Sequence, residues 1–350
     1  MFGATFYHGL EAVVINTAAL LLTLVVFGIL VALFGVDPFD VLYVLYLGGF
    51  GTKISIESTL TLAAPLMLAA LCTAIPARAG LLVIGGEGAL VIGGVATVLV
   101  GVHLSGLPFG LGVALMGLSG ALAGGLWIGA AGALRQYRGV NETISTLLMN
   151  YIAIALLNHL VSGPIRDFSN VLKVSSWNVP ERLMVGNLPG LDVHWGLVVG
   201  VAVCLVLYVV TQRTTFGFAI DILGGNQRAA QMSGLPINRM VILSCVIGGA
   251  GAGLAGTMEV IAVHGFASDS LVVGFGYVGI LIAFLARQNP FAIICVAILV
   301  GGISASGGLM QRRFDMPDAT TAVLQGLLFI MVLASNTLYG RFRFLQPKET

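Results

Sequence analysis

Long apolar stretches separated by short polar segments run along almost the whole chain. A transmembrane helix needs about 20 apolar residues, and most of these stretches approach that length. We place ten spans at 12–34, 58–76, 80–102, 106–134, 143–162, 194–212, 240–262, 274–287, 291–310 and 319–338. The short span 274–287 fits a half-helix or a tilted re-entrant piece, and the half-apolar segment 36–57 fits an interfacial helix. The pattern predicts an all-α, polytopic transmembrane helical bundle.

Only 9% of the 350 residues are charged and 58% are hydrophobic, with a mean hydropathy of +1.02. Soluble domains carry about 25% charged residues, so this composition cannot cover a soluble surface and indicates an integral membrane protein. Glycine occurs 48 times, roughly double its usual share, as expected where membrane helices pack closely. The net charge of +1 gives no indication of nucleic-acid binding.

The placement of lysine and arginine predicts the orientation, because cytoplasmic loops carry an excess of both. With the N-terminus in the cytoplasm, ten of the sixteen basic residues fall inside, and ten spans return the C-terminus to the cytoplasm. We expect a single transmembrane domain over 1–350, with an external loop at 163–193 and a cytoplasmic segment at 213–239. The pair Arg312-Arg313 falls outside unless 291–310 is re-entrant.

Within the cytoplasmic segment, residues 226–236 have the signals of a short capped helix. Asn226 is a good N-cap, Gly234 can end the helix in the left-handed conformation, and Pro236 prevents its continuation. A helix of about two turns is not stable alone in water and needs a surface to lie on. The segment therefore indicates a docking element between spans six and seven. Its candidate contact residues are Asn226, Arg228, Ala229, Ala230 and Gly234.

A carboxylate accompanies three glycines in the third span, at Gly85-Gly86-Glu87-Gly88. Such glycines interrupt a helix, which is tolerated in a membrane only where protein or water surrounds the backbone. An ionisable residue inside a membrane is a functional candidate, so Glu87 is a candidate for the substrate pathway. The alternative is that Glu87 lies near the cytoplasmic end of the span and pairs with Arg78.

A second polar cluster opens the fifth span. Asn141 or Thr143 can cap this helix, and Glu142 suits its positive end. The cluster either lines a pathway or forms hydrogen bonds between helices, and the pattern leaves both open. Its candidate pathway residues are Asn141, Glu142, Ser145, Thr146 and Asn150.

Other patterns indicate packing rather than chemistry. The small residues of 248–256 and 120–124 suit close helix contacts, and the four cysteines stand singly in apolar spans. There is no phosphate-binding G-x-x-x-x-G-K-[ST] loop, no catalytic arrangement and no histidine pair at metal-ligand spacing. We therefore expect no metal, no cofactor and no catalysis by this chain.

Several stretches resemble one family, the permease subunits of bacterial ABC importers for simple sugars and nucleosides. Residues 140–153 are similar to its V-N-E-x-I-S-T…N-Y-I-A stretch, and 84–88 resemble its N-I-G-x-E-G-Q motif. Residues 215–234 resemble its cytoplasmic coupling segment, which adds Gly224 to the candidate contact residues. The resemblance covers about 55–340 and is closest to the longer permease of nucleoside importers.

The resemblance implies an ATP-driven importer in the bacterial cytoplasmic membrane. An external binding protein would deliver a nucleoside or a related small polar solute, or alternatively a simple sugar. Embedded in the lipid bilayer, this chain and a second, related permease would together form the translocation pathway. ABC ATPase subunits would dock on the coupling segment.

The sequence departs from the family pattern at three positions. Val83 replaces an asparagine and Ala89 a glutamine, which bears on the substrate if those positions line the pathway. Asp221 stands where the coupling segment often has arginine, so it reverses a charge near the expected docking surface.

Two other functions fit parts of the pattern. A stand-alone secondary transporter needs an ion or proton relay inside the membrane, for which only Glu87, Glu142 and Glu259 are available. A membrane enzyme or assembly factor needs an acid–base cluster outside the membrane, and the sequence has none.

Overall fold

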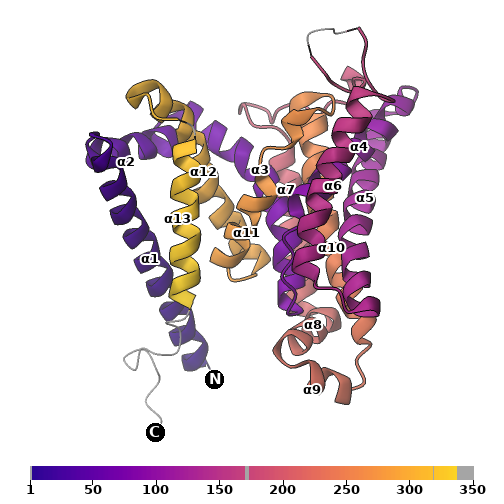
Figure 1. Ribbon diagram of the computed structural model, residues 1–350, viewed down its shortest axis with the longest axis horizontal. Helices are drawn as coiled ribbons and strands as arrows, with labels where there is room; N and C mark the ends of the chain where they lie inside the picture. The colour runs from indigo at the N-terminus through magenta and orange to yellow at the C-terminus, as the bar shows by residue number, and fades with distance from the viewer. Residues whose placement is uncertain (1, 170–172, 318, 337–350) are drawn as a thin grey trace. The chain divides into compact units, whose positions relative to one another are not determined.

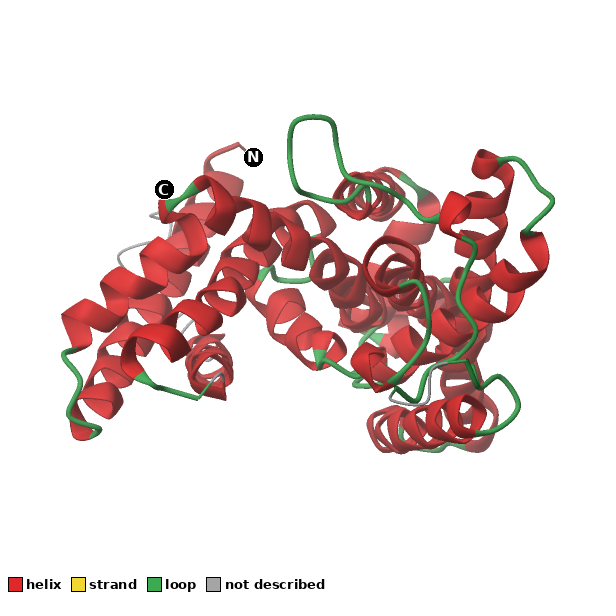
Figure 2. Cartoon of the chain, turned by 90° about the horizontal axis from the view of Figure 1, so that it is seen from above, coloured by secondary structure: helices red, strands yellow, loops and turns green. Residues whose placement is uncertain are grey.

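The computed structural model describes residues 2–169, 173–317 and 319–336. Helices joined by loops make up these parts of the chain, and no strand occurs among them (Figure 2). The predicted all-α class is therefore confirmed. The helices are α1 (Phe2–Leu33), α2 (Pro38–Tyr46), α3 (Lys53–Arg78), α4 (Gly86–Gly101), α5 (Phe109–Arg138), α6 (Glu142–Ser162), α7 (Gly196–Arg213), α8 (Thr215–Gly225), α9 (Gln227–Met232), α10 (Ile237–Met258), α11 (Phe275–Leu285), α12 (Pro290–Phe314) and α13 (Ala319–Asn336).

Seven helical segments in the described chain are long and apolar enough to cross a membrane, judged by length and composition. They are Lys53–Arg78, Gly86–Leu104, Phe109–Arg138, Glu142–Ser162, Gly196–Arg213, Ile237–His264 and Pro290–Phe314. The remaining three predicted spans coincide with shorter apolar segments: Thr17–Leu33 within α1, Asp269–Leu285, which contains α11, and Ala319–Ser335 within α13. The protein is thus a multi-pass membrane protein, and the number of ten crossings stays a prediction.

The chain packs as two compact units, Met1–Thr59 with Val300–Thr350, and Leu60–Leu299. In the first unit, α1 packs against α13 (Figure 1). The predicted interfacial segment contains α2, where Asp37 caps the helix by accepting from the Phe39 N–H at 2.8 Å. A five-residue π-helical turn, Leu47–Gly51, follows. A single domain over 1–350 stays a prediction.

One predicted helix boundary in this region is wrong. The second span was expected to begin at residue 58, but α3 begins at Lys53. The extra turn is polar, and Lys53 and Glu57 pair across it at 3.5 Å. An apolar pattern cannot detect such a turn, because its charged residues interrupt the stretch on which the span was predicted.

In the second unit, α10 packs along α5 and α4. The small residues predicted to allow close packing do so, because a Cβ on Gly253 would collide with the backbone carbonyl of Gly120. On α4, a Cβ at Gly93 would lie 2.5 Å from the Gly253 Cα. The backbones of these helices are therefore too close for any side chain between them. Small residues that allow such close approach are typical of the contacts between membrane helices.

The third span starts later than predicted. Residues 81–84 are not helical, and α4 begins at Gly86. The glycines near Glu87 therefore lie at the beginning of a helix instead of interrupting one. At the eighth predicted span, α11 is only 11 residues long and follows a largely irregular stretch, 265–274. This length agrees with the short span expected there, while its nature as a half-helix or a re-entrant piece stays a prediction. The beginnings of α4 and α11 meet, and this meeting point positions the first candidate site.

Candidate functional site

Glu87 in the first turn of α4 binds the N-terminus of α11. Its side chain is fully buried, and its two carboxylate oxygens accept from the N–H groups of Gly274 and Gly276, each at 2.7 Å. A helix N-terminus carries a partial positive charge, so Glu87 is the counter-charge of α11. The alternative pairing of Glu87 with Arg78 is wrong, because Arg78 binds Asp221.

Gly276 brings the two helices into backbone contact. A Cβ at this position would collide with the backbone N and Cα atoms of Glu87. Sequence reasoning did not single out Gly274 or Gly276. Glycine is frequent throughout this chain, and a backbone N–H donor leaves no mark on the residue type.

Thr146 and Asn150 of α6 hold the connection between α3 and α4. The Thr146 hydroxyl accepts from the Ile84 N–H at 3.2 Å. The Asn150 side chain accepts from the Gly88 N–H at 2.8 Å and donates to the Ile84 carbonyl at 3.1 Å. A third bond of 3.4 Å joins Asn150 to the Tyr277 hydroxyl on α11. Both polar side chains therefore join segments that are distant in sequence.

The other members of this cluster are also engaged within the chain. Asn141 caps α6, accepting from the N–H groups of Thr143 and Ile144 at 2.9 and 3.1 Å. Glu142 pairs with Arg135 and accepts from the Leu82 N–H at 3.4 Å. The Ser145 hydroxyl donates to the Glu142 carbonyl. Of these three residues, Glu142 joins α6 to other segments, whereas Asn141 and Ser145 bond within the first turn of α6. A pathway role for the cluster stays a prediction.

The candidate docking element has the predicted caps. Asn226 accepts from the N–H groups of Arg228 and Ala229 at 3.0 and 3.2 Å, and α9 spans Gln227–Met232. Gly234 has φ +73°, in the left-handed region. Both α8 and α9 lie at one end of the second unit, opposite the loop that precedes α7 (Figure 1).

The two alanines of α9 do not both face outward. Ala230 is fully buried and packs with Ile220, Leu223 and Ile237 in the core beneath the helix. It anchors α9 to its own chain, so its methyl group is not available to a partner. Met232 is 85% exposed, a feature that sequence reasoning missed. Arg228 is exposed as well.

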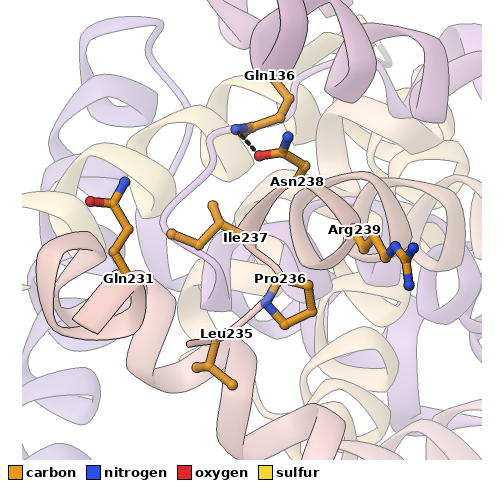
Figure 3. Close-up of a pocket in the computed structure, with 7 residues that line it drawn as sticks. All are labelled: Gln136, Gln231, Leu235, Pro236, Ile237, Asn238 and Arg239. Atoms are coloured by element: carbon orange, nitrogen blue, oxygen red, sulfur yellow. Dashed lines mark hydrogen bonds between the residues drawn. The ribbon is translucent and has the colours of Figure 1, made fainter. Parts of the chain in front are cut away.

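A pocket of about 510 Å³, lined by both polar and apolar side chains, opens beside α9. Gln136 from α5 donates to the Asn238 side chain at 2.7 Å on one wall (Figure 3). Arg239 contributes the charged group of the pocket, and Leu235 and Pro236 form its apolar part. Sequence reasoning assigned no role to Gln136, because it lies 102 positions from its partner Asn238.

The described residues form a multi-pass helical bundle with a capped helix at one end, an arrangement that fits a transport permease. The chain belongs to the family described as branched-chain amino acid transport system, permease component, whose model matches residues 55–333. The resemblance stated from the sequence motifs is thereby confirmed.

Curated relatives cover most of the chain. It is 30% identical to the glucose ABC transporter permease protein TsgB13 of Haloferax volcanii, over 92% of this chain and 87% of the relative. It is 28% identical to the guanosine ABC transporter permease protein NupP of Bacillus subtilis, over 87% of each. It is 25% identical to NupQ, a second guanosine ABC transporter permease protein of the same organism, over 80% and 91%. The chain is an ABC transporter permease subunit and not an enzyme.

Proposed function

We propose that this chain forms half of the pathway of an ATP-driven importer and couples to an ABC ATPase through α9. The observation that carries the proposal is the anchored helix: Asn226 caps it, buried Ala230 fixes it to the core, and Met232 projects from it. An exposed methionine is a soft, adaptable apolar group suited to a partner's groove. A rigid helix of this kind can pass on movement of the partner.

The proposed topology has ten spans, both termini and the α8–α9 segment in the cytoplasm, and the loop 163–193 outside. Its support is the positive charge at the end of the second unit that carries α9. Arg78, Arg135 and Arg138 lie in the last turns of α3 and α5, and Arg228 and Arg239 lie in or beside α9. Positive charge of this kind is typical of a cytoplasmic face. In a bacterium, the membrane is the cytoplasmic one.

The docking surface consists of Arg228, Met232 and the pocket that Gln136 and Arg239 line. Arginine is among the residue types that most often dominate the binding energy of a protein contact. The partner is an ABC ATPase subunit with an apolar groove and a carboxylate near it. The remaining partners are an external binding protein, the lipid bilayer and a second permease. That two guanosine permease proteins of one organism, NupP and NupQ, both match supports a related but different second chain.

The acidic residues inside the membrane support an importer driven by ATP over an ion-coupled one. A proton relay inside a membrane is built from a chain of Asp, Glu and His side chains. Glu87 is bound by two backbone N–H groups and Glu142 pairs with Arg135, so these contacts join neither of them to a second acidic or histidine side chain. Glu259, which lies 3.5 Å from His264, is the candidate that has such a neighbour.

The proposed solute is a nucleoside, on the similarity to NupP and NupQ. The second candidate is a simple sugar, favoured by the 30% identity to TsgB13. Both are small, polar ring compounds rich in hydroxyl groups. Uptake of labelled guanosine and, separately, of labelled glucose into proteoliposomes with the complete importer distinguishes the two candidates, with the other solute added unlabelled as competitor. ATP-dependent uptake of neither solute would overturn both candidates.

The docking proposal is tested by purifying the importer through a tag on this chain. Met232→Glu and Arg228→Glu should each leave the chain in the membrane but reduce the ATPase that co-purifies. The matched control, Arg138→Gln, removes an exposed charge from the same end of the unit, outside the docking surface. Normal ATPase recovery with both variants would overturn the docking surface. Ala230→Arg is unsuitable, because it would disrupt the core.

A further inference from the structure

Arg78 at the end of α3 forms a two-pronged ion pair with Asp221 of α8. Its Nε and Nη2 groups donate to the two carboxylate oxygens at 2.8 and 2.6 Å. The arginine side chain is only 10% exposed, whereas the aspartate is 48% exposed. Such a fork fixes direction as well as distance, because both N–H groups must meet their oxygens together.

The backbones of α8 and of the end of α3 are also in close contact beside the Arg78–Asp221 pair. A Cβ on Gly224 would collide with the Arg78 carbonyl, and a Cβ on Gly80 would lie 3.3 Å from the Gly224 Cα. On the inner face of α8, Ile220 and Leu223 are buried in the same core as Leu81. The end of α3 and the segment α8 therefore have ionic, backbone and apolar contacts together.

Beyond the Arg78–Asp221 pair, hydrogen bonds also hold the connection between α3 and α4. The Thr73 hydroxyl donates to the Val83 carbonyl at 2.9 Å, and Thr146 and Asn150 hold Ile84. The segment then enters α4, where Glu87 binds the N-terminus of α11. Chains of contacts of this kind can carry energetic coupling between distant sites.

We propose that the Arg78–Asp221 pair is the joint through which movement of the docking segment reaches the α4–α11 contact. Both are positioning residues, since they act through α8 and through the connection between α3 and α4. The inference rests on the proposed function, because it needs an ATPase that moves α9. It also explains Asp221: the charge that departs from the family pattern serves a partner within the chain.

The test uses the complete importer in proteoliposomes, with ATP hydrolysis and solute uptake measured on the same sample. Asp221→Asn loses the charge and one acceptor but keeps the size of the side chain. Arg78→Lys keeps the charge and loses the fork. The exchange variant, Arg78→Asp with Asp221→Arg, restores an ion pair of the same total side-chain length. Arg138→Gln is the control for removal of one charge at this end.

We expect Asp221→Asn to retain its ATPase and to lower uptake per ATP hydrolysed by at least about fivefold, the lower end of typical coupling between sites. Arg78→Lys should show an intermediate loss, and the exchange variant should recover most of the uptake per ATP. A merely structural role would reduce the amount of folded protein without changing this ratio.

Three results would overturn the joint. The first is an unchanged ratio of uptake to ATP hydrolysed in Asp221→Asn with normal ATPase recovery. The second is an exchange variant no better than the two variants with one charge reversed, Arg78→Asp and Asp221→Arg. Loss of the ATPase from Asp221→Asn would also overturn it, since Asp221 would then belong to the docking surface. Failure of the proposed function is a different result, in which Met232→Glu and Arg228→Glu both leave the ATPase bound.

Discussion

The Glu87 carboxylate and the Gly276 N–H lie 2.7 Å apart at a point where two helices of the same chain both begin. Gly274 supplies the second N–H, so each carboxylate oxygen has one backbone donor at α11. The contact joins residues 189 positions apart. It holds the short helix α11 to α4 without any side chain from α11.

Glu87→Gln should weaken this contact. An amide has one acceptor oxygen, so one of the two buried N–H groups would face an NH₂ group and lose its bond. An unsatisfied buried group costs about 1–3 kcal/mol. We expect a lower unfolding temperature in detergent and reduced uptake. Unchanged unfolding temperature and uptake at normal expression would show that the Glu87 carboxylate does not stabilise the contact between α4 and α11.

Gly276→Ala should separate α11 from α4. The added Cβ would collide with the Glu87 backbone, and backbone shifts of this type cost about 1–3 kcal/mol. Gly326→Ala in α13 is the matched control, because nothing lies within 4 Å of its added Cβ. In a helix, that control should be neutral or stabilising by up to about 1 kcal/mol. Equal effects of the two variants on thermal unfolding would contradict the close contact.

Asn226→Ala should loosen α9. Loss of an N-cap costs about 1 kcal/mol, and α9 has only six residues to withstand it. We expect faster amide hydrogen exchange across α9 and weaker recovery of the ATPase. Asn226→Asp keeps the acceptor oxygen and should behave like the unaltered chain. Slow exchange in the alanine variant would show that Ala230 alone holds the helix.

The Arg135–Glu142 pair should respond unequally to removal of its two members. Arg135 is 38% exposed and Glu142 only 8%. Arg135→Met leaves a buried carboxylate without its cation, whereas Glu142→Gln leaves a guanidinium that water can reach. Removing one partner of a fully buried pair costs about 3–5 kcal/mol, and partial exposure lowers this. Thermal unfolding should therefore rank Arg135→Met as the less stable variant, and the reverse order would contradict the burial.

Local features of the docking element could be predicted from the sequence. An N-cap acts on residues two and three positions away, and Gly234 needs only its own φ angle to end the helix. The apolar stretches likewise predicted the helices, because burial in lipid demands long apolar runs. For these elements, all the relevant chemistry lies within a few residues.

Contacts between distant segments could not be predicted in the same way. Glu87 was singled out as a pathway candidate, a role that stays a prediction, and Arg78 was considered as its alternative partner because it is the nearest cation in sequence. The actual partners are backbone N–H groups, which every residue except proline possesses. Ala229 and Ala230 look alike in sequence, and a helix of six residues is too short for its periodicity to show which one is buried.

The binding of Glu87 at the start of α11 changes what that helix end can hold. A helix N-terminus with free N–H groups attracts phosphate, but here a carboxyl group of the chain itself already occupies that position. The beginning of α11 is therefore not a vacant anion site, and an anion could bind there only by displacing Glu87.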